Sequence, residues 1–303
     1  MNTPVLIVLL GPTGVGKTEL SLRIAERFNA PIVSCDSRQF YREMKIGTAA
    51  PSEEQLMRVK HYFIATRSIT EEYNAGRYEE DAMQLLGELF QKHKVVLLAG
   101  GSMMYLDAVC NGFDALPQIP SEVRRKWIAF YEEHGLDAIR QKLKETDAAY
   151  YSEVDVSNSQ RIIHALEICE VANMPYSRLR KKQKKERPFS IIKLGLNRPR
   201  PELYERINRR VDEMIRDGLE EEARQLFPYK QLNALNTVGY KEFFDYFRGH
   251  ISRDNAIDLV KQDSRRYAKR QLTWFNRDKE IVWFHPEQEK EIVVFLNTKI
   301  NDK

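Results

Sequence analysis

Residues 5–18 decide the fold, and they run VLIVLLGPTGVGKT. Val5–Leu10 is an uninterrupted apolar run, as expected of a strand that is buried on both faces of a parallel sheet. Gly11–Thr18 fits the pattern G-x-x-x-x-G-K-[ST], and we call it the phosphate loop. Apolar residues recur at every fourth position over 19–28, so a helix is expected directly after the loop.

The phosphate loop predicts a bound diphosphate or triphosphate. Its glycines let the backbone wrap closely around phosphate oxygens, and its N–H groups form an anion cradle with the helix N-terminus. Lys17 supplies a positive charge, and Thr18 can place its hydroxyl on Mg²⁺ as a metal ligand. The predicted binding residues are Gly11, Pro12, Thr13, Gly14, Val15, Gly16, Lys17 and Thr18. The loop does not identify the molecule that carries the phosphates, and ATP is one candidate.

The strand and helix signals alternate in the first third of the chain and again near its end. Further strands are predicted over 31–35, 94–99 and 190–194, and helices over 78–92 and 201–227. This alternation predicts an α/β fold, in which a P-loop NTPase-like parallel sheet carries helices on both faces.

The segment 114–187 has weak strand signals and many helical ones. Pro120 lies near its start and Pro188 follows its end. We therefore predict an all-helical domain over 114–187, inserted into an α/β core that consists of 1–113 and 188–303.

The composition excludes several classes of protein. Of 303 residues, 42% are hydrophobic and 30% are charged, which is an ordinary globular balance. Cys35, Cys110 and Cys169 are widely spaced and form no Cys-x-x-Cys pair, so we expect reduced thiols. No apolar stretch approaches the roughly 18 residues of a membrane span, and no signal-peptide pattern precedes the first strand. We expect a cytoplasmic protein.

Polar residues that follow the predicted strands are candidates for chemistry. An ordinary P-loop NTPase has a second strand that ends in Asp, whereas the strand over 94–99 is followed by Gly100, Gly101 and Ser102. Asp36 follows the strand over 31–35 instead, and the ends of parallel strands line the ligand crevice. A carboxylate near the loop suits a general base. A helix cap or an indirect magnesium contact is the alternative for Asp36, and a turn residue is the alternative for Ser102.

Two clusters of basic residues fit contact with nucleic-acid phosphates. The first cluster has seven basic side chains and one acidic one within 178–187, namely Arg178, Arg180, Lys181, Lys182, Lys184, Lys185 and Arg187 beside Glu186. The second cluster, 261–279, interleaves basic residues with Tyr267, Trp274 and Phe275. Exposed aromatic side chains could stack unpaired bases. A solvated helix face is the alternative for each cluster, and core packing is the alternative for the aromatic residues.

Three arginines, Arg206, Arg209 and Arg210, lie in the helix predicted over 201–227. Arg206 and Arg210 are four residues apart and share a helix face, and guanidinium groups suit a diphosphate. Ion pairs with neighbouring glutamates are the alternative.

Taken in order along the chain, these segments resemble the bacterial tRNA dimethylallyltransferases, also called the IPP transferase family. The resemblance rests on the phosphate loop, 36–51 (DSRQFYREMKIGTAAP), 100–105 (GGSMMY), Gln160-Arg161, 238–241 (VGYK) and 267–275 (YAKRQLTWF). This ordered set covers nearly the whole chain. Ser102 and His164 stand where that family usually has threonine and arginine, and Arg38 and Phe40 are also unusual.

The resemblance implies transfer of a dimethylallyl group from dimethylallyl diphosphate to N6 of the adenosine immediately 3′ of the anticodon. The acceptors would be tRNAs that read codons beginning with U. It also implies a catalytic set of Asp36 as the base, Thr18 with Mg²⁺, and Arg206 at the departing diphosphate. The residues implied to contact the tRNA anticodon stem-loop are Asp36, Ser37, Arg38, Gln39, Ser102, Arg124, Gln160, Arg161 and His164. A monomer is expected.

Two other classes of function use the same residues. A small-molecule kinase would hold ATP on the phosphate loop and use Asp36 as the acceptor base. It needs neither the helical insertion nor the basic and aromatic C-terminal segment. A non-catalytic RNA-binding protein would not need the intact pair of Lys17 and Thr18.

Overall fold

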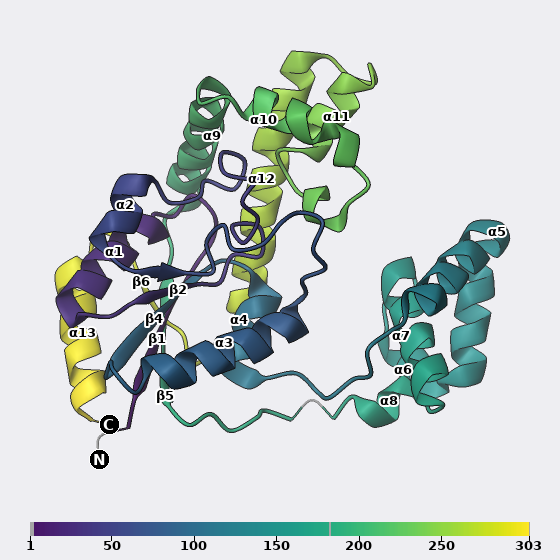
Figure 1. The fold of residues 1–303 in the computed structure, drawn as a ribbon, viewed down its shortest axis with the longest axis horizontal. Coiled ribbons are helices and arrows are strands. Elements are labelled where there is room, and N and C mark those ends of the chain that lie inside the picture. The colour runs from purple at the N-terminus through teal and green to yellow at the C-terminus, as the bar shows by residue number, and fades with distance from the viewer. Residues whose placement is uncertain (1–2, 182, 303) are drawn as a thin grey trace. The chain divides into compact units, whose positions relative to one another are not determined.

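The computed structural model describes residues 3–181 and 183–302 and divides into two compact units (Figure 1). The core unit lies within Met1–Cys110 and Glu186–Lys303, and the insertion unit is Asn111–Lys185. The insertion therefore begins three residues before the predicted 114–187 and ends two residues before its end.

A six-stranded sheet forms the centre of the core unit, with the strand order β3-β2-β4-β1-β5-β6 and every neighbouring pair parallel. The strands are β1 (Val5–Leu10), β2 (Ile32–Ser34), β3 (His61–Tyr62), β4 (Val95–Gly100), β5 (Ser190–Leu196) and β6 (Val282–Phe284). The predicted α/β fold with a parallel sheet is confirmed. The short edge strands β3 and β6 were missed, because two or three residues are too few to show a periodic pattern.

Helices cover both faces of the sheet, because alternate residues of β1 enter two separate hydrophobic clusters. Val5, Ile7 and Leu9 pack with residues of α1 (Lys17–Phe28), α9 (Arg200–Arg216) and α13 (Glu289–Asn301). Leu6, Val8 and Leu10 pack with residues of α3 (Ala75–Leu89) and α4 (Met103–Asn111). Figure 1 shows α1 and α13 on one side of the sheet and α3 and α4 on the other.

The region after β5 adds a helical layer with its own hydrophobic cluster. Its elements are α9, α10 (Leu219–Leu226), the 3-10 turns Phe227–Tyr229 and Asn233–Leu235, α11 (Lys241–Phe247) and α12 (Arg253–Phe275). The prediction of one helix over 201–227 was wrong. The chain breaks at Gly218, whose φ of 102° lies in the left-handed region that favours glycine, and α10 begins after it. A short helix, α2 (Glu53–Arg58), lies earlier in the core unit.

The described residues of the insertion unit form helices and no strand. They are α5 (Ser121–Thr146), α6 (Ala148–Glu153), α7 (Ser159–Ala172) and α8 (Tyr176–Leu179). A kink interrupts α5 at Gly135, where φ is 78°. Ile139, Leu143, Ile162 and Leu166 form a small core between α5 and α7, so the unit has an apolar centre of its own. None of the helices within 3–181 and 183–302 is long and apolar enough to cross a membrane.

Candidate active site

The site lies where three neighbouring strands of the sheet end. The order β2-β4-β1 places the phosphate loop, Asp36 and Gly100–Ser102 at one edge, as predicted from the parallel sheet. The Cys35 N–H donates to Ala99 O at 2.8 Å, and the Ser102 N–H donates to Cys35 O at 3.3 Å. A Cβ at Gly100 would lie 2.3 Å from Cys35 O, so glycine is required for this close approach.

The phosphate loop adopts a backbone that its glycines make possible. Gly14 and Gly16 have φ values of 78° and 109°, and Gly16 precedes the first residue of α1. A Cβ at Gly14 would lie 2.8 Å from Ile207, and one at Gly11 would lie 2.6 Å from Leu196 O. The glycines of the motif are therefore needed for two reasons: positive φ angles, and neighbouring atoms that leave no room for a Cβ.

Lys17 and Thr18 begin α1 at the end of the loop. Lys17 Nζ donates to Gly11 O at 2.9 Å and to Pro12 O at 2.8 Å, which uses two of its three N–H groups. The pKa of Lys17 is lowered to about 7, mainly by desolvation and also by the Arg210 charge, while the Asp36 charge opposes this shift. Thr18 is exposed, and its hydroxyl makes no hydrogen bond to another described residue. A free hydroxyl oxygen is the type of ligand that Mg²⁺ accepts.

Three arginines contact three successive residues of the phosphate loop. Arg198 Nε donates to Val15 O at 3.0 Å, Arg206 Nε to Gly14 O at 3.0 Å, and Arg210 Nη1 to Thr13 Oγ1 at 3.1 Å. A Cβ at Gly16 would lie 3.8 Å from Arg206 Nη2 and 3.9 Å from Arg198 Nη2. These guanidinium groups therefore flank the anion cradle.

The predicted arginines separate into two groups. Arg206 and Arg210 face the loop, whereas Arg209 pairs with Glu213 at 3.9 Å and is exposed. Burial and the charge of Arg198 lower the pKa of Arg206. A bound anion would offset this crowding of positive charge. Sequence reasoning missed Arg198, because it lies outside the predicted helix and no spacing sets it apart.

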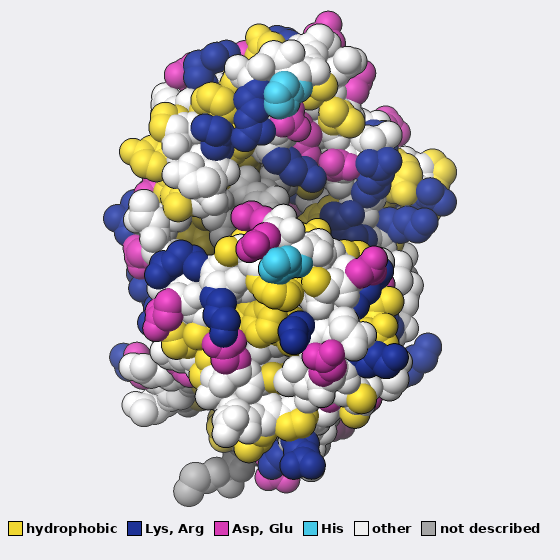
Figure 2. Space-filling model, turned by 90° about the vertical axis from the view of Figure 1, so that its right-hand side faces the viewer, with side chains coloured by type: hydrophobic (Ala, Val, Ile, Leu, Met, Phe, Trp, Pro, Cys, Tyr) yellow, Lys and Arg dark blue, Asp and Glu magenta, His cyan; other side chains and the backbone are white. Residues whose placement is uncertain are grey.

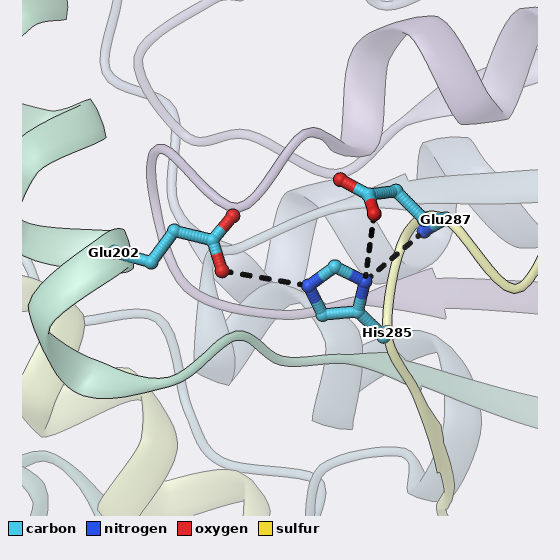
Figure 3. Close-up of side chains that lie close together, drawn as sticks. All are labelled: Glu202, His285 and Glu287. Carbon is cyan, nitrogen blue, oxygen red and sulfur yellow. Dashed lines mark hydrogen bonds and ion pairs between the residues drawn. The ribbon is translucent and has the colours of Figure 1, made fainter.

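Arg198 is held by Glu202, His285 and Glu287, and Figure 3 shows how these three side chains lie together. Arg198 Nη1 contacts Glu202, Glu287 at 3.4 Å and His285 Nε2 at 3.4 Å, and His285 in turn lies 3.5 Å from Glu202. The possible ligand atoms of Glu202, His285 and Glu287 lie within 4.8 Å of one another. Because a guanidinium group contacts all three, this cluster is an ion-pair network that orients Arg198.

Asp36 is fixed by its own loop and by the end of β4. Asp36 Oδ1 accepts a hydrogen bond from the Arg38 N–H at 3.0 Å, and Oδ2 accepts none from a described residue. The Ser37 N–H donates to Ser102 Oγ at 2.9 Å, and Ser102 Oγ donates to Ser37 Oγ at 3.1 Å. The Asp36 charge acts on the pKa of Lys17, so the carboxylate and the phosphate loop share one site.

Helix α12 closes this site with residues that sequence reasoning did not assign to it. The Thr13 N–H donates to Gln271 Oε1 at 2.9 Å, and Gln271 Nε2 donates to Gly101 O at 2.8 Å. The pKa of Tyr267 is raised to about 12, mainly by burial and also by the Asp36 charge, while Ser102 opposes this rise.

Some residues of the two basic clusters are packed against the core, and RNA contact by the others stays a prediction. Phe275 is buried, and Trp274 is partly buried against the same cluster and donates through Nε1 to Asp107 at 3.0 Å. Arg187 is 7% exposed in its side chain and pairs with Glu79 at 3.0 Å, so it is structural. Lys182 lies outside the described residues. On the face shown in Figure 2, Lys and Arg side chains are mixed with Asp and Glu.

Four predicted tRNA contacts lie in the insertion unit. Gln160, Arg161 and His164 are exposed on the first turns of α7. Arg124 reaches from α5 and makes two hydrogen bonds to buried Glu167, at 3.1 and 3.3 Å, and His164 Nδ1 lies 3.6 Å from the same carboxylate. Partial desolvation of the imidazole lowers the pKa of His164, and the Glu167 charge opposes this shift. These residues therefore share one surface, and their contact with RNA stays a prediction.

Two further predicted contacts follow Asp36. Arg38 Nη1 donates to Asn233 O at 3.2 Å, and Gln39 Nε2 donates to Thr48 O and Ala49 O, each at 3.2 Å. Both side chains thus fix the segment that carries them, and their role toward RNA stays a prediction.

These features define a class of protein: a phosphate-loop α/β enzyme that places a carboxylate beside its anion cradle and carries a helical insertion. The sequence profile described as IPP transferase matches residues 39–278. The chain belongs to this family.

Relatives and solved structures of similar proteins agree with this assignment. The chain is 56% identical to tRNA dimethylallyltransferase 1 of Bacteroides fragilis, over 99% of this chain and 100% of the relative. It is 55% identical to tRNA dimethylallyltransferase 1 of Bacteroides thetaiotaomicron, over 97% and 95%. The crystal structure of tRNA isopentenylpyrophosphate transferase from Bacillus halodurans matches with a TM-score of 0.73 at 33% identity, over 98% and 97% of the two chains.

Proposed function

We propose that the protein transfers a dimethylallyl group from dimethylallyl diphosphate to N6 of the adenosine immediately 3′ of the tRNA anticodon. The products are N6-(dimethylallyl)adenosine and diphosphate. Family membership supports this reaction. The observation that carries it is the placement of Asp36 beside the phosphate loop, with the loop, Gly100–Ser102 and Asp36 at three adjacent strand ends. The enzyme acts as a cytoplasmic monomer.

The donor side of the site holds the diphosphate. The loop N–H groups, Lys17, Arg206 and Arg210 surround the position of the anion with positive charge. Charge accumulates on the diphosphate oxygens as the C–O bond to the allyl group breaks, and fixed positive groups stabilise that charge. Mg²⁺, when bound, neutralises diphosphate oxygens, and the free hydroxyl of Thr18 would be its protein ligand.

The acceptor side removes a proton. As the bond from N6 to the allyl carbon forms, the C–O electron pair leaves with diphosphate and N6 becomes positively charged. Asp36 accepts the N6 proton through Oδ2, while the Arg38 N–H keeps Oδ1 in place. An adenine that is flipped out of its stack presents N6 to such a carboxylate.

Contact with the tRNA anticodon stem-loop involves two groups of residues. Asp36, Ser37, Arg38, Gln39 and Ser102 belong to the core unit, and Arg124, Gln160, Arg161 and His164 to the insertion unit. The second group supplies the surface on α5 and α7, where Glu167 orients Arg124.

The decisive experiment supplies the protein with unmodified tRNA, Mg²⁺ and dimethylallyl diphosphate, digests the RNA and measures nucleoside masses. We expect isopentenyladenosine with the native protein and, at equal time, at least about 100-fold less with Asp36→Asn. A parallel reaction with ATP and small acceptors tests the kinase alternative. No mass gain in the RNA, together with phosphate transfer from ATP, would overturn the proposed function.

A further inference from the structure

Gln271 is a buried polar residue in the last turns of α12, and both ends of its amide are used. The residue is 1% exposed. The amide oxygen accepts from the Thr13 N–H at 2.9 Å, and the amide nitrogen donates to Gly101 O at 2.8 Å. An amide that bridges two backbone groups so far apart in the sequence fixes their separation, because a buried group left unpaired is costly.

The two backbone groups belong to the two sides of the site. Thr13 lies in the phosphate loop, which holds the donor. Gly101 precedes Ser102, whose hydroxyl binds the Ser37 N–H next to Asp36. Gln271 therefore connects the phosphate loop to Gly101, and Ser102, the next residue, is bonded to the segment that carries Asp36.

The fit at this connection is close. A Cβ at Gly101 would lie 2.4 Å from Gln271 Nε2, so the amide occupies the space that a larger residue would fill. Tyr267 lies one turn earlier on the same face of α12, close enough for Ser102 and the Asp36 charge to act on its pKa. One face of the helix thus contacts both the loop and the end of β4.

We propose that Gln271 is a positioning residue, which sets the distance and orientation of the phosphate loop relative to Asp36. This inference rests on the proposed function. Prenyl transfer requires the allyl carbon, held by its diphosphate, to meet N6 near Asp36 at a reactive distance. A displacement of about 1 Å can lower such a rate roughly 100-fold, and a shift of Thr13 would also weaken binding of the diphosphate itself.

The first test is Gln271→Met, which keeps the length of the side chain and removes both hydrogen bonds. We expect binding of inorganic diphosphate with Mg²⁺ to weaken about 10-fold, and kcat for tRNA prenylation to fall by about 10- to 100-fold. The matched control is Gln262→Met, nine residues earlier and about half a turn around the same helix. Gln262 makes no hydrogen bond to a described residue, and its variant should retain both values.

The second test is Gln271→Glu, measured across pH. A protonated carboxyl group can accept from the Thr13 N–H and donate to Gly101 O, as the amide does, whereas the ionised form has no proton for Gly101 O. Diphosphate affinity of this variant, relative to the native protein, should rise as the pH is lowered from about 8 to about 6, toward the carboxyl pKa. A residue with only a packing role would give no such pH-dependent rescue.

The outcomes separate this inference from the proposed function. If Gln271→Met binds inorganic diphosphate as the native protein does, or Gln271→Glu shows a flat ratio, the positioning role is wrong. If Gln271→Met does not fold, the pH profile of Gln271→Glu decides. If the native protein prenylates no tRNA but both variants alter diphosphate binding as expected, the proposed function fails and the role of Gln271 stands.

Discussion

The donor side and the acceptor side of the site are built from different chemistry. The donor side combines a glycine-rich backbone with Lys17, Arg198, Arg206 and Arg210, a concentration of positive charge. The acceptor side has one carboxylate, Asp36, among the hydroxyls of serine and tyrosine. Under the proposed function, the donor side binds through charge, whereas the acceptor side depends on the position of one carboxylate.

The strongest change in turnover is expected on the acceptor side, at Asp36. Asp36→Asn should lower kcat for prenyl transfer by about 10²- to 10⁴-fold, because a base contributes that much in the transition state. Donor affinity, measured by calorimetry with inorganic diphosphate, should change by less than about 3-fold. Loss of diphosphate binding with normal turnover would contradict the division between the two sides.

The second prediction concerns diphosphate affinity on the donor side. Lys17→Met should weaken inorganic diphosphate binding by about 10- to 100-fold, because it removes a charge-assisted hydrogen bond. Affinity for tRNA alone, measured by filter binding, should be unchanged. Equal losses for both ligands would show that Lys17 supports the whole fold.

Lys17 also predicts a pH dependence of donor binding. Its pKa of about 7 means that the free protein loses this positive charge as the pH rises above about 7, while a bound anion favours the charged form. Binding above pH 7 should therefore take up a proton, and affinity should fall by at most about 10-fold per pH unit. Calorimetry in buffers of different ionisation enthalpy measures this uptake. The Lys17→Met protein, as the control, should take up correspondingly less.

A smaller effect separates two arginines of α9. Arg206→Lys should raise the KM for dimethylallyl diphosphate by about 5- to 10-fold, because lysine lacks the fork that reaches both Gly14 O and the cradle. Arg209→Lys, on the exposed face, is the control and should leave the KM unchanged. An unchanged KM for Arg206→Lys would show that the positive charge at this position is sufficient and that the guanidinium fork is not needed.

The smallest effect concerns the basic run within 178–187. Replacing Lys181, Lys182, Lys184 and Lys185 by glutamine should weaken tRNA binding by a few fold. The slope of log affinity against log salt concentration should become shallower, by an amount that corresponds to up to about four phosphate contacts. Donor binding should be unaffected. An unchanged salt slope would assign this run to a solvated surface.

The predictable part of the site is the part that is local in the chain. The phosphate loop follows from eight consecutive residues, and Asp36 follows from the rule that strand ends line the crevice. The strands over 5–10, 31–35, 94–99 and 190–194 were each placed to within two residues. In these segments, backbone conformation and burial are encoded by neighbouring residues.

The remainder depends on contacts between distant residues. Gln271 meets Thr13 across 258 positions, and Arg198 meets Val15 across 183. No periodic pattern indicates either contact. Aromatic residues such as Trp274 and Phe275 suit RNA stacking as well as core packing. Only the structure shows that Phe275 is buried and that Trp274 is partly buried and bonded to Asp107. The sequence therefore left the role of 261–279 open and did not predict that α12 contacts the phosphate loop through Gln271.

The ends of the insertion carry a consequence for chain entropy. The Lys185 N–H donates to Asn111 O at 2.7 Å, and Arg187, paired with Glu79, also donates to Ala108 O and Val109 O at 2.6 and 2.8 Å. These hydrogen bonds hold the two ends of the insertion next to each other. The core unit therefore pays the entropy of closing a loop whose length is that of the insertion. Doubling the length of such a loop costs only roughly 0.6 kcal/mol. Exchange of this segment for a longer or shorter helical one should leave the parallel sheet nearly as stable as before.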